Sequence, residues 1–351
     1  MFLVPQDAPD GFYPQVTVIV PAYNAAGTLP SCLTALANQS YPRTAYEVIV
    51  VDDGSTDATA AIAHDAGVSV ITQPNAGPAA ARNAGIRAGS GDIILFTDAD
   101  CEPVVDWIAQ MVAPMADIDF AGVKGSYRTR QSAVVARLAQ CEFEERYDRQ
   151  ERLLVIDFVD SYAAAFRAMV LREVGGFDPA FPYANNEDVD LSYRIARLGH
   201  RLVFNRKAVV YHRHVTSWRA YIRLKIRRGY WRVMALKMHP DKALRDSYTP
   251  QLLKLQVLLI YAMMALSLAT LLWRPFEWIA AIVMLSLCLS TIPFARLVWR
   301  CDRAVTPWAP FFILARSVAF SFGIIGGIIG MKRFRPTTNL RASTECPRDG
   351  R

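Results

Sequence analysis

The region that most constrains this chain is an apolar one near its C-terminal end, residues 251–331. It contains two stretches, 252–273 and 276–299, that are nearly free of charge, and each is long enough to cross a bilayer as a helix. A third stretch, 308–330, is equally apolar apart from Arg316. The sequence therefore predicts a membrane region with three helices, the last of which either crosses fully or lies in the interface.

Positive charge is concentrated on both sides of this apolar region. The net charge is +7, and the basic residues cluster between Arg213 and Arg245 and again after Met331. Because both clusters flank membrane helices, an anionic membrane surface explains them better than nucleic acid does. We therefore expect a basic amphipathic linker at 215–250 that lies on the membrane, a basic tail at 332–351, and no nucleic-acid partner.

Charge also indicates the orientation in the membrane. Basic residues of the linker precede the first span, and such residues usually stay in the cytoplasm. The same tendency conflicts with full crossing by the third stretch, which would export the basic tail.

The N-terminus has no basic segment before an apolar core, so no signal peptide is expected. The six cysteines form no Cys-x-x-Cys pair, which favours reduced thiols. We expect a multi-pass protein of the inner (plasma) membrane with its soluble part in the cytoplasm.

The first 250 residues have the pattern of a soluble α/β domain. Hydrophobic residues make up 52% of the chain and charged residues 20%, which excludes intrinsic disorder. Buried strands are expected at 16–20, 47–51, 68–72 and 92–97, with helices at about 29–39, 57–66 and 77–88. Strands that alternate with helices in this way predict a parallel sheet with both faces covered.

Polar clusters follow three of these strands: Tyr23-Asn24, Asp52-Asp53 and Asp98-Ala-Asp100. Each cluster alone could be a turn followed by a helix cap. Ligands bind beyond the carboxyl ends of parallel strands, however, and these three ends belong to one sheet. Carboxylates that converge on one crevice repel one another, so together they indicate a divalent cation or a ligand rich in hydrogen-bond donors.

Four segments carry a resemblance to a known family. They are VIVPAYNAAGTLPSCLTAL at 18–36, EVIVVDDGSTDAT at 47–59, NAGPAAARNAGIRAGSGDIILFTDAD at 75–100 and VGGFDPAFPYANNEDVDLSYRIARLGHRLVF at 174–204. In this respect the chain resembles the family 2 glycosyltransferases, inverting enzymes with the nucleotide-sugar-binding GT-A fold. The resemblance implies an α/β fold class: a GT-A catalytic domain at 1–214 with a mainly parallel sheet, followed by C-terminal transmembrane helices.

The resemblance implies a site for a nucleotide-diphosphate sugar. It assigns four residues to the nucleoside pocket: Pro21, Ala22, Tyr23 and Asp53. A carboxylate such as Asp53 can accept a hydrogen bond from the imide N–H of uracil, so a UDP-sugar is the expected donor. Asn75, Gly77 and Arg82 border the donor, and Arg82 can offset phosphate charge.

Asp98-Ala-Asp100 corresponds to the family's Asp-x-Asp element. Side chains two residues apart on an extended chain point to the same side. We expect Asp100 to bind Mg²⁺ or Mn²⁺, while Asp98 contacts the ribose or shares the ion. The cation would stabilise the charge that develops on the leaving nucleotide. His212 follows the strand expected at 207–211 and is a further candidate for the metal or the diphosphate.

The acceptor hydroxyl needs a base, and Asp188 in Asn186-Glu-Asp188 matches the family's Glu-Asp element. A helix N-terminus lowers the pKa of a carboxylate, so an opposing influence such as neighbouring Glu187 is needed to keep Asp188 basic. The alternative is simple helix capping. Asp157 and Asp160 could contact acceptor hydroxyls or merely begin a strand.

These expectations describe a membrane-anchored hexosyltransferase of the cell envelope or of exopolysaccharide synthesis. It would move one sugar to a lipid-linked or membrane-associated acceptor. A polyprenyl-phosphate glycosyltransferase is an alternative, because its acceptor is already an anion. A processive synthase is a weaker one, because the Gln-x-x-Arg-Trp element of such enzymes is missing. A nucleotide-binding scaffold without catalysis is disfavoured by the intact acidic residues.

Overall fold

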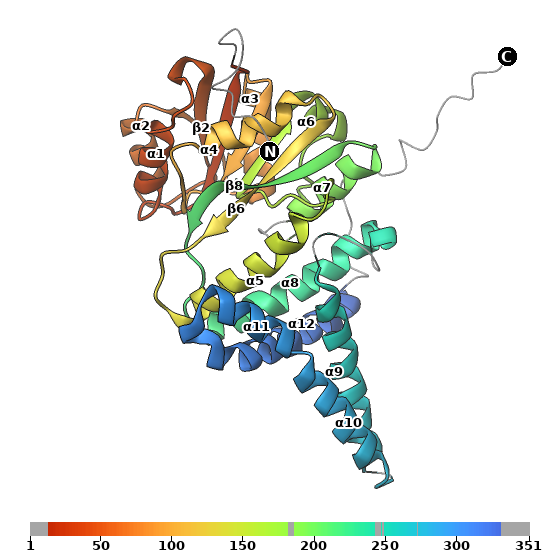
Figure 1. Ribbon diagram of the computed structural model, residues 1–351. Coiled ribbons are helices and arrows are strands. Elements are labelled where there is room, and N and C mark those ends of the chain that lie inside the picture. Colours follow the sequence, from red (N-terminus) through yellow and green to blue (C-terminus); the bar gives the residue numbers. More distant parts are fainter. Residues whose placement is uncertain (1–12, 182–185, 243–246, 248, 272, 331–351) are drawn as a thin grey trace, which may run out of the picture.

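The computed structural model describes residues 13–181, 186–242, 247, 249–271 and 273–330. The predicted basic tail at 332–351 lies outside these residues. So do residues 1–12, where no signal peptide is expected. The described part consists of a mixed sheet with helices on both faces, a group of helices beside it, and a helical hairpin that projects away from the sheet (Figure 1).

One eight-stranded sheet forms the centre of the catalytic half, in the order β3-β2-β1-β4-β7-β6-β8-β5. Its strands are β1 (Val16–Ala22), β2 (Tyr46–Asp52), β3 (Ser69–Thr72), β4 (Ile93–Thr97), β5 (Cys101–Pro103), β6 (Phe120–Arg128), β7 (Ala163–Arg167) and β8 (Arg201–His212). The first four strands are parallel to one another, as the sequence predicts. Beyond β4 the sheet is mixed, because β7 is antiparallel to both β4 and β6 while β8 is parallel to β6.

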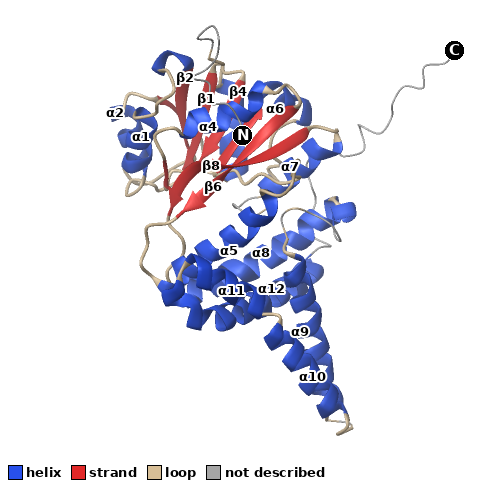
Figure 2. Ribbon diagram, viewed as in Figure 1, coloured by secondary structure: helices blue, strands red, loops and turns tan. Residues whose placement is uncertain are grey.

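Helices cover both faces of this sheet (Figure 2). They are α1 (Leu29–Ala37), α2 (Thr59–Asp65), α3 (Pro78–Ala88), α4 (Trp107–Val112), α5 (Val134–Gln150), α6 (Ala168–Val174) and α7 (Glu187–Arg197). The small residues of α3 allow a close approach to the sheet, since a Cβ at Gly85 would lie 2.5 Å from Ile19 of β1. This packing brings the first turn of α3 to the carboxyl ends of β1 and β4, where ligands are expected.

The C-terminal helices form a second region below the sheet (Figure 1). They are α8 (Trp218–Met238), α9 (Gln251–Ala269), α10 (Phe276–Leu289), α11 (Ile292–Cys301) and α12 (Ala309–Gly330). Three stretches are apolar and long enough to cross a membrane, namely Gln251–Ala269, Phe276–Cys301 and Arg303–Gly330. Helices α9 and α10 form the projecting hairpin, whereas α12 lies beside α8 under the catalytic domain.

The contact between α8 and α12 is unusually close. A Cβ added to Gly323 of α12 would lie 2.1 Å from the carbonyl oxygen of Ile226, and one added to Gly229 of α8 would lie 2.4 Å from that of Phe320. The two backbones therefore touch without intervening side chains, and we call this contact the glycine seam. Further along, Tyr221 packs on Phe312 with ring centroids 4.3 Å apart.

The linker helix expected on the membrane surface corresponds to α8, but it is not a free amphipathic helix. Tyr221, Lys225 and Arg232 are buried in it. They face α5, α7 and α12 instead of lipid, since Lys225 pairs with Glu142 of α5 and Arg232 contacts Tyr193 of α7. Helix α8 thus belongs to the packed body of the protein.

Candidate functional site

A cavity of about 650 Å³ lies at the carboxyl ends of β1, β2 and β4, and we call it the donor pocket. It is lined by Pro21, Ala22, Tyr23, Asn24, Asp53, Asn75, Gly77, Arg82, Asp98 and Asp100, among others. The structure therefore brings together every residue that the sequence assigned to the nucleotide sugar. The ring of Tyr23 is 54% exposed, which leaves a face free for stacking. The volume lies in the range of cavities that hold cofactors and drug-sized ligands.

Asp53 has a structural task in this pocket. Its carboxylate accepts hydrogen bonds from the side chain of Gln73 at 2.7 Å and from the backbone N–H groups of Ala76 and Gly77 at 2.9 and 2.8 Å. These bonds fix the loop that carries Asn75 and leads into α3. The expected contact between Asp53 and a uracil base stays a prediction, and the loop contacts were not apparent from the sequence.

Arg82 is buried and connects the two acidic clusters of the site. Its guanidinium donates to Asp98 and to Glu187, in both cases at 2.9 Å. A buried arginine with carboxylates on both sides is held rigidly, because its planar fork matches carboxylate geometry. Arg82 was expected beside a phosphate; in the structure it also links β4 to the start of α7.

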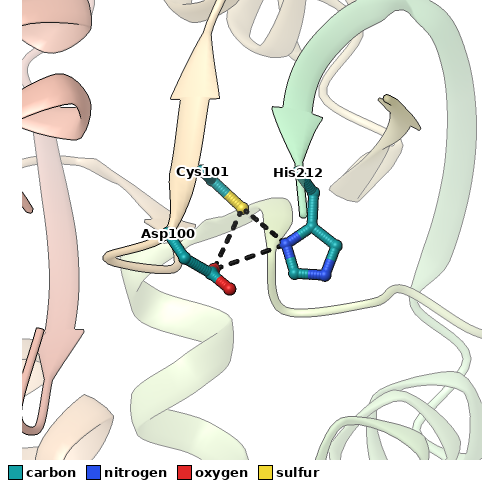
Figure 3. Close-up of side chains that lie close together, drawn as sticks. All are labelled: Asp100, Cys101 and His212. Carbon is teal, nitrogen blue, oxygen red and sulfur yellow. Dashed lines mark hydrogen bonds and ion pairs between the residues drawn. The ribbon is translucent and has the colours of Figure 1, made fainter. Parts of the chain in front are cut away.

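Asp100 lies beside His212 at the end of β8 (Figure 3). The distance from Asp100 Oδ1 to His212 Nδ1 is 3.4 Å, and the Cys101 Sγ lies 3.9 Å from the same nitrogen. Burial would raise the pKa of Asp100, but the hydrogen bond and charge of His212, together with the other hydrogen bonds of the carboxylate, hold it below its ordinary value. Strand β5 pairs Cys101 with His212, which explains why residues so far apart in sequence meet here.

This cluster suits a hard divalent cation through two of its three side chains. A carboxylate and an imidazole nitrogen are common ligands of Mn²⁺, whereas thiolates select softer metals. Burial raises the pKa of the Cys101 thiol, and the charges of Asp98 and Asp100 add to this effect. The donor chemistry therefore fits Asp100 and His212 as ligands, with Asp98 nearby, and leaves Cys101 as a packing residue.

A second cavity, of about 370 Å³, adjoins the donor pocket and shares Arg82, Asp98 and Asp100 with it. We call it the acceptor pocket. Its other lining residues include Tyr127, Glu142, Phe143, Asp160, Tyr162, Glu187, Asp188, His212, His214, Tyr221, Lys225 and Arg228. Tyr127 stacks on His212 with ring centroids 4.4 Å apart, so an aromatic wall of this pocket also orients the metal candidate.

Asp188 lies in this acceptor pocket at the N-terminal turn of α7. Burial raises its pKa to about 8, and the charges of Glu187 and Asp160 act in the same direction. Burial likewise raises the pKa of Glu187, although Arg82 opposes the shift. Asp188 is therefore surrounded by influences that make it a stronger base, despite the backbone N–H of Val189 that donates to it at 2.8 Å.

The two acceptor-side candidates differ in position. Asp160 lines the acceptor pocket, where it pairs with buried Lys124 and, at 3.4 Å, with Arg146. Asp157 is not among the residues that line this pocket. It pairs with Lys242 at 2.8 Å and accepts a hydrogen bond from the backbone N–H of Ser247. Asp157 thus holds Lys242 and Ser247, which lie between α8 and α9.

Residues of α5 and α8 are the part of the site that sequence reasoning missed. Arg227 lines the donor pocket, and Glu142, Lys225 and Arg228 line the acceptor pocket. The sequence assigned the α8 residues to the membrane surface, because a run of basic and aromatic residues gives no indication of which side faces a cavity. No motif marked Glu142.

Known proteins similar to this chain are glycosyltransferases. Residues 17–175 match the family described as Glycosyl transferase family 2. Glycosyltransferase AglE of Haloferax volcanii is 31% identical over 205 residues, which cover 54% of this chain and 64% of that protein. The pre-mycofactocin glycosyltransferase of Mycobacterium tuberculosis is 31% identical over 237 residues, which cover 65% of this chain and 48% of that protein. The chain thus spans 64% of the first relative and 48% of the second.

A solved structure shares the fold over most of the chain. It is the mannosyltransferase PcManGT of Pyrobaculum calidifontis in complex with GDP-Man and Mn²⁺, with a TM-score of 0.60 and 22% identity. The similarity covers 90% of this chain and 88% of that one. The family match over residues 17–175, the similar relatives and the GT-A-like sheet agree, and the chain contains a family 2 glycosyltransferase domain.

Proposed function

We propose that the chain transfers one sugar, with inversion, from a nucleotide-diphosphate sugar to a membrane-associated acceptor. The observation that carries this proposal is the arrangement of two adjoining pockets, which share Arg82, Asp98 and Asp100 while Asp188 lies in the second one alone. A donor in the first pocket and an acceptor in the second would meet at these shared residues.

Asp188 would act as the base. It takes the proton of the acceptor hydroxyl while the hydroxyl oxygen attacks C1 of the sugar from the side opposite the nucleotide, and the nucleoside diphosphate leaves with the bonding electrons. Its raised pKa suits this role, because a base with a pKa near the working pH accepts a proton efficiently.

Asp100 and His212, with Asp98, would hold Mg²⁺ or Mn²⁺ beside the donor diphosphate. Such a cation supplies Lewis-acid stabilisation of the charge on the leaving group. The Mn²⁺ and GDP-Man of the Pyrobaculum mannosyltransferase, which shares the fold, support this assignment. We propose a UDP-sugar as the first donor to test because Asp53 lines the pocket.

A donor panel tests the activity directly. Purified full-length protein in detergent is incubated with UDP-, GDP- and dTDP-sugars, Mn²⁺ and a membrane lipid extract, and products are identified by mass spectrometry. We expect one donor to give a product with a single added hexose. If no donor is transferred or hydrolysed in the presence of Mn²⁺ or Mg²⁺, the proposed function is wrong.

We also propose that the hairpin of α9 and α10 crosses the membrane. Helix α9 has 19 residues and so is about 28 Å long, close to the thickness of the hydrocarbon core. The tip of the hairpin carries Arg274 and Glu277 with the exposed indoles of Trp273 and Trp278. Charged residues framed by tryptophans are typical of a membrane–water interface, here the one opposite the catalytic domain.

Helix α12 would lie in the near interface without crossing. Helix α12 runs beside α8. Trp218 at the start of α8 packs on Phe311 of α12, and further along Tyr230 of α8 contacts Gly327 and Gly330 of α12. Because α8 has exposed arginines along its length, it cannot enter the hydrocarbon core, and neither can a helix packed along it. The outer side of α12 is apolar, with Phe322 and Ile329 exposed, as in helices that lie in the membrane plane.

This arrangement keeps the basic tail on the cytoplasmic side, in agreement with the positive-inside tendency. Labelling of Cys346 with a membrane-impermeant maleimide tests it, in a variant in which the exposed Cys288 and Cys301 are serine. Cys346 should react in inside-out vesicles only. Labelling in right-side-out vesicles alone would show that α12 crosses.

A further inference from the structure

A third cavity, of about 40 Å³, lies between the catalytic domain and the membrane helices. We call it the basic cavity. Its lining residues are Glu142, Phe143, Arg146, Lys225, Arg228, Thr249, Pro250, Leu253, Arg316 and Phe320. Four of them, Glu142, Phe143, Lys225 and Arg228, also line the acceptor pocket, so the two cavities adjoin. The basic cavity has room for roughly three water-sized groups, which suits a phosphate but not a sugar ring.

Cations outnumber carboxylates in the wall of this cavity. Glu142 is the one acidic residue among those that line it, whereas four lining residues are basic: Arg146, Lys225, Arg228 and Arg316. Glu142 accepts from Lys225 at 2.8 Å and from Arg316 at 3.3 Å. Burial lowers the pKa of Lys225 to about 8, and the charge of Arg228 adds to this shift. Arg316 also pairs with Glu145 at 3.7 Å and Arg146 with Asp160 at 3.4 Å, so Arg228 is the cation of this wall that no described carboxylate neutralises, and it favours an additional anion.

Two arginines have hydrogen-bonding capacity left in this cavity. Among the residues that the structure describes, none forms an ion pair or hydrogen bond with the guanidinium of Arg228. Arg316 is only 4% exposed, and its Nε has no acceptor in the described part of the chain. A buried donor without a partner costs free energy, so an acceptor oxygen at this point would be stabilised. Guanidinium groups match the geometry of phosphate oxygens.

The opposite wall of the basic cavity is apolar and belongs to the membrane helices. Leu253 of α9 and Phe320 of α12 line it, and both belong to one hydrophobic cluster with Val257 of α9. Tyr261 and Ile324 pack against the same cluster further along the two helices. An anion in the basic cavity therefore has a sugar-sized cavity on one side and the apolar cluster between α9 and α12 on the other.

From this juxtaposition we infer that the basic cavity binds the phosphate group of a polyprenyl-type acceptor lipid. The hydrocarbon chain would lie against α9 and α12, and the group that accepts the sugar would extend into the acceptor pocket toward Asp188. The inference rests on the proposed function and narrows it, because it names the acceptor class as a lipid phosphate or diphosphate.

Binding of defined lipids to the full-length protein in detergent tests this inference. The probes are a long-chain polyprenyl phosphate, the matching polyprenol, phosphatidylglycerol and inorganic phosphate, and dissociation constants are measured by native mass spectrometry and by competition. We expect the polyprenyl phosphate to bind at least about tenfold more tightly than the polyprenol, since the phosphate supplies the charged hydrogen bonds. Inorganic phosphate should compete only weakly, because it lacks the apolar chain.

Arg228→Gln is the variant of choice, because Arg228 has no partner in the described chain whose loss would disturb folding. Its affinity for polyprenyl phosphate should fall about ten- to a hundredfold, while its affinity for the polyprenol should not change. Arg223→Gln is the matched control, since Arg223 is an exposed arginine of the same helix outside all three cavities. It should bind the lipid as the unmodified chain does.

Metal-dependent hydrolysis of the donor is measured on the same samples and tests the proposed function separately. Equal affinity for the polyprenol and its phosphate, equal binding of phosphatidylglycerol, or equal losses in the two arginine variants would each overturn the inference while donor hydrolysis persists. Tight binding of inorganic phosphate alone would also overturn it, because it would show an anion site that does not recognise lipid.

Discussion

The donor pocket and the acceptor pocket adjoin, but the chain builds them in different ways. Apart from Arg227, the donor pocket is lined by residues from 21 to 100, which lie at or after the carboxyl ends of parallel strands or in the first half of α3. The acceptor pocket takes residues from α3, β6, α5, α7, β8 and α8 and from the segments that follow β4 and precede β7, all between 82 and 228. The donor pocket therefore forms within consecutive βαβ units, whereas the acceptor pocket forms only when the whole domain and α8 are assembled.

The two pockets depend on different interactions for their shape. The strand ends of the donor pocket are fixed by backbone pairing between β1, β2 and β4, so a side chain that only faces the pocket, such as Asp100, can change with little effect on the fold, unlike buried Arg82. The acceptor pocket is held by long-range ion pairs such as Lys225–Glu142 and by the glycine seam behind α8. Substitutions in its supports should therefore alter its geometry as well as its chemistry.

The largest effect is expected in the donor pocket, for Asp100→Ala. Loss of the carboxylate that faces His212 should lower transfer by about 10³ or more, because the leaving diphosphate loses its counter-charge. The melting temperature should stay within a few degrees, since a ligand carboxylate at a strand end adds little packing. Asp119→Ala, at an exposed carboxylate, is the control for stability and should retain activity. Normal transfer in Asp100→Ala would contradict the metal assignment.

Asp188→Asn tests the acceptor pocket at the reaction centre. Turnover should fall by about 10²–10⁴, the usual contribution of a positioned base, with donor affinity unchanged. Because the base must be ionised and its pKa is raised to about 8, the turnover of the unmodified chain should rise with pH up to about 8. The variant should lose this rise. A loss below tenfold, with the pH profile unchanged, would point to an acceptor that is already an anion.

Arg82→Gln affects both pockets at once, because Arg82 holds Asp98 on the donor side and Glu187 on the acceptor side. We expect donor affinity and turnover each to fall about tenfold or more, and the free energy of unfolding to fall by about 3 kcal/mol, as when a buried ion pair loses one partner. Arg87→Gln, at an exposed position of the same helix, is the control. If only donor affinity or only turnover falls, the two pockets are independent of each other.

The smallest effect is expected for Gly323→Ala in the glycine seam. The added methyl would lie 2.1 Å from the carbonyl oxygen of Ile226, so α8 must shift, at about 1–3 kcal/mol of stability. Gly326→Ala is a close control, because its Cβ would meet only Tyr230 at 3.7 Å. Thermal unfolding in detergent and the KM for acceptor should change in the first variant alone, while donor affinity is the same in both.

Most of the donor side could be predicted from the sequence, and the physical reason is locality. Val16–Val20 and Glu47–Val51 are buried runs that end in polar residues, and the parallel pairing of such strands places their ends together. The bonds of Asp53 to the backbone of Ala76 and Gly77 could not be predicted, because they depend on how the loop closes.

The supports of the acceptor pocket could not be read from the sequence. Arg316 stands out there as a charge in an apolar helix, but its partner Glu142 lies 174 residues earlier in the chain. The basic helix indicated a membrane surface, whereas three of its polar side chains are buried against other helices. For the same reason a fragment that ends near Lys237, although it contains every motif, would expose the inner side of α8 that α12 covers.

The glycine seam has a consequence for the size of the acceptors that can react. The backbones of α8 and α12 are in contact, so a change of side-chain rotamers cannot alter the distance between these two helices. The distance from α12 to Asp188 is therefore fixed. In the proposed orientation, an acceptor anchored in lipid must present its reactive group at that distance. On the proposed function, we therefore expect the enzyme to discriminate between acceptors by the distance between their lipid anchor and their reactive group.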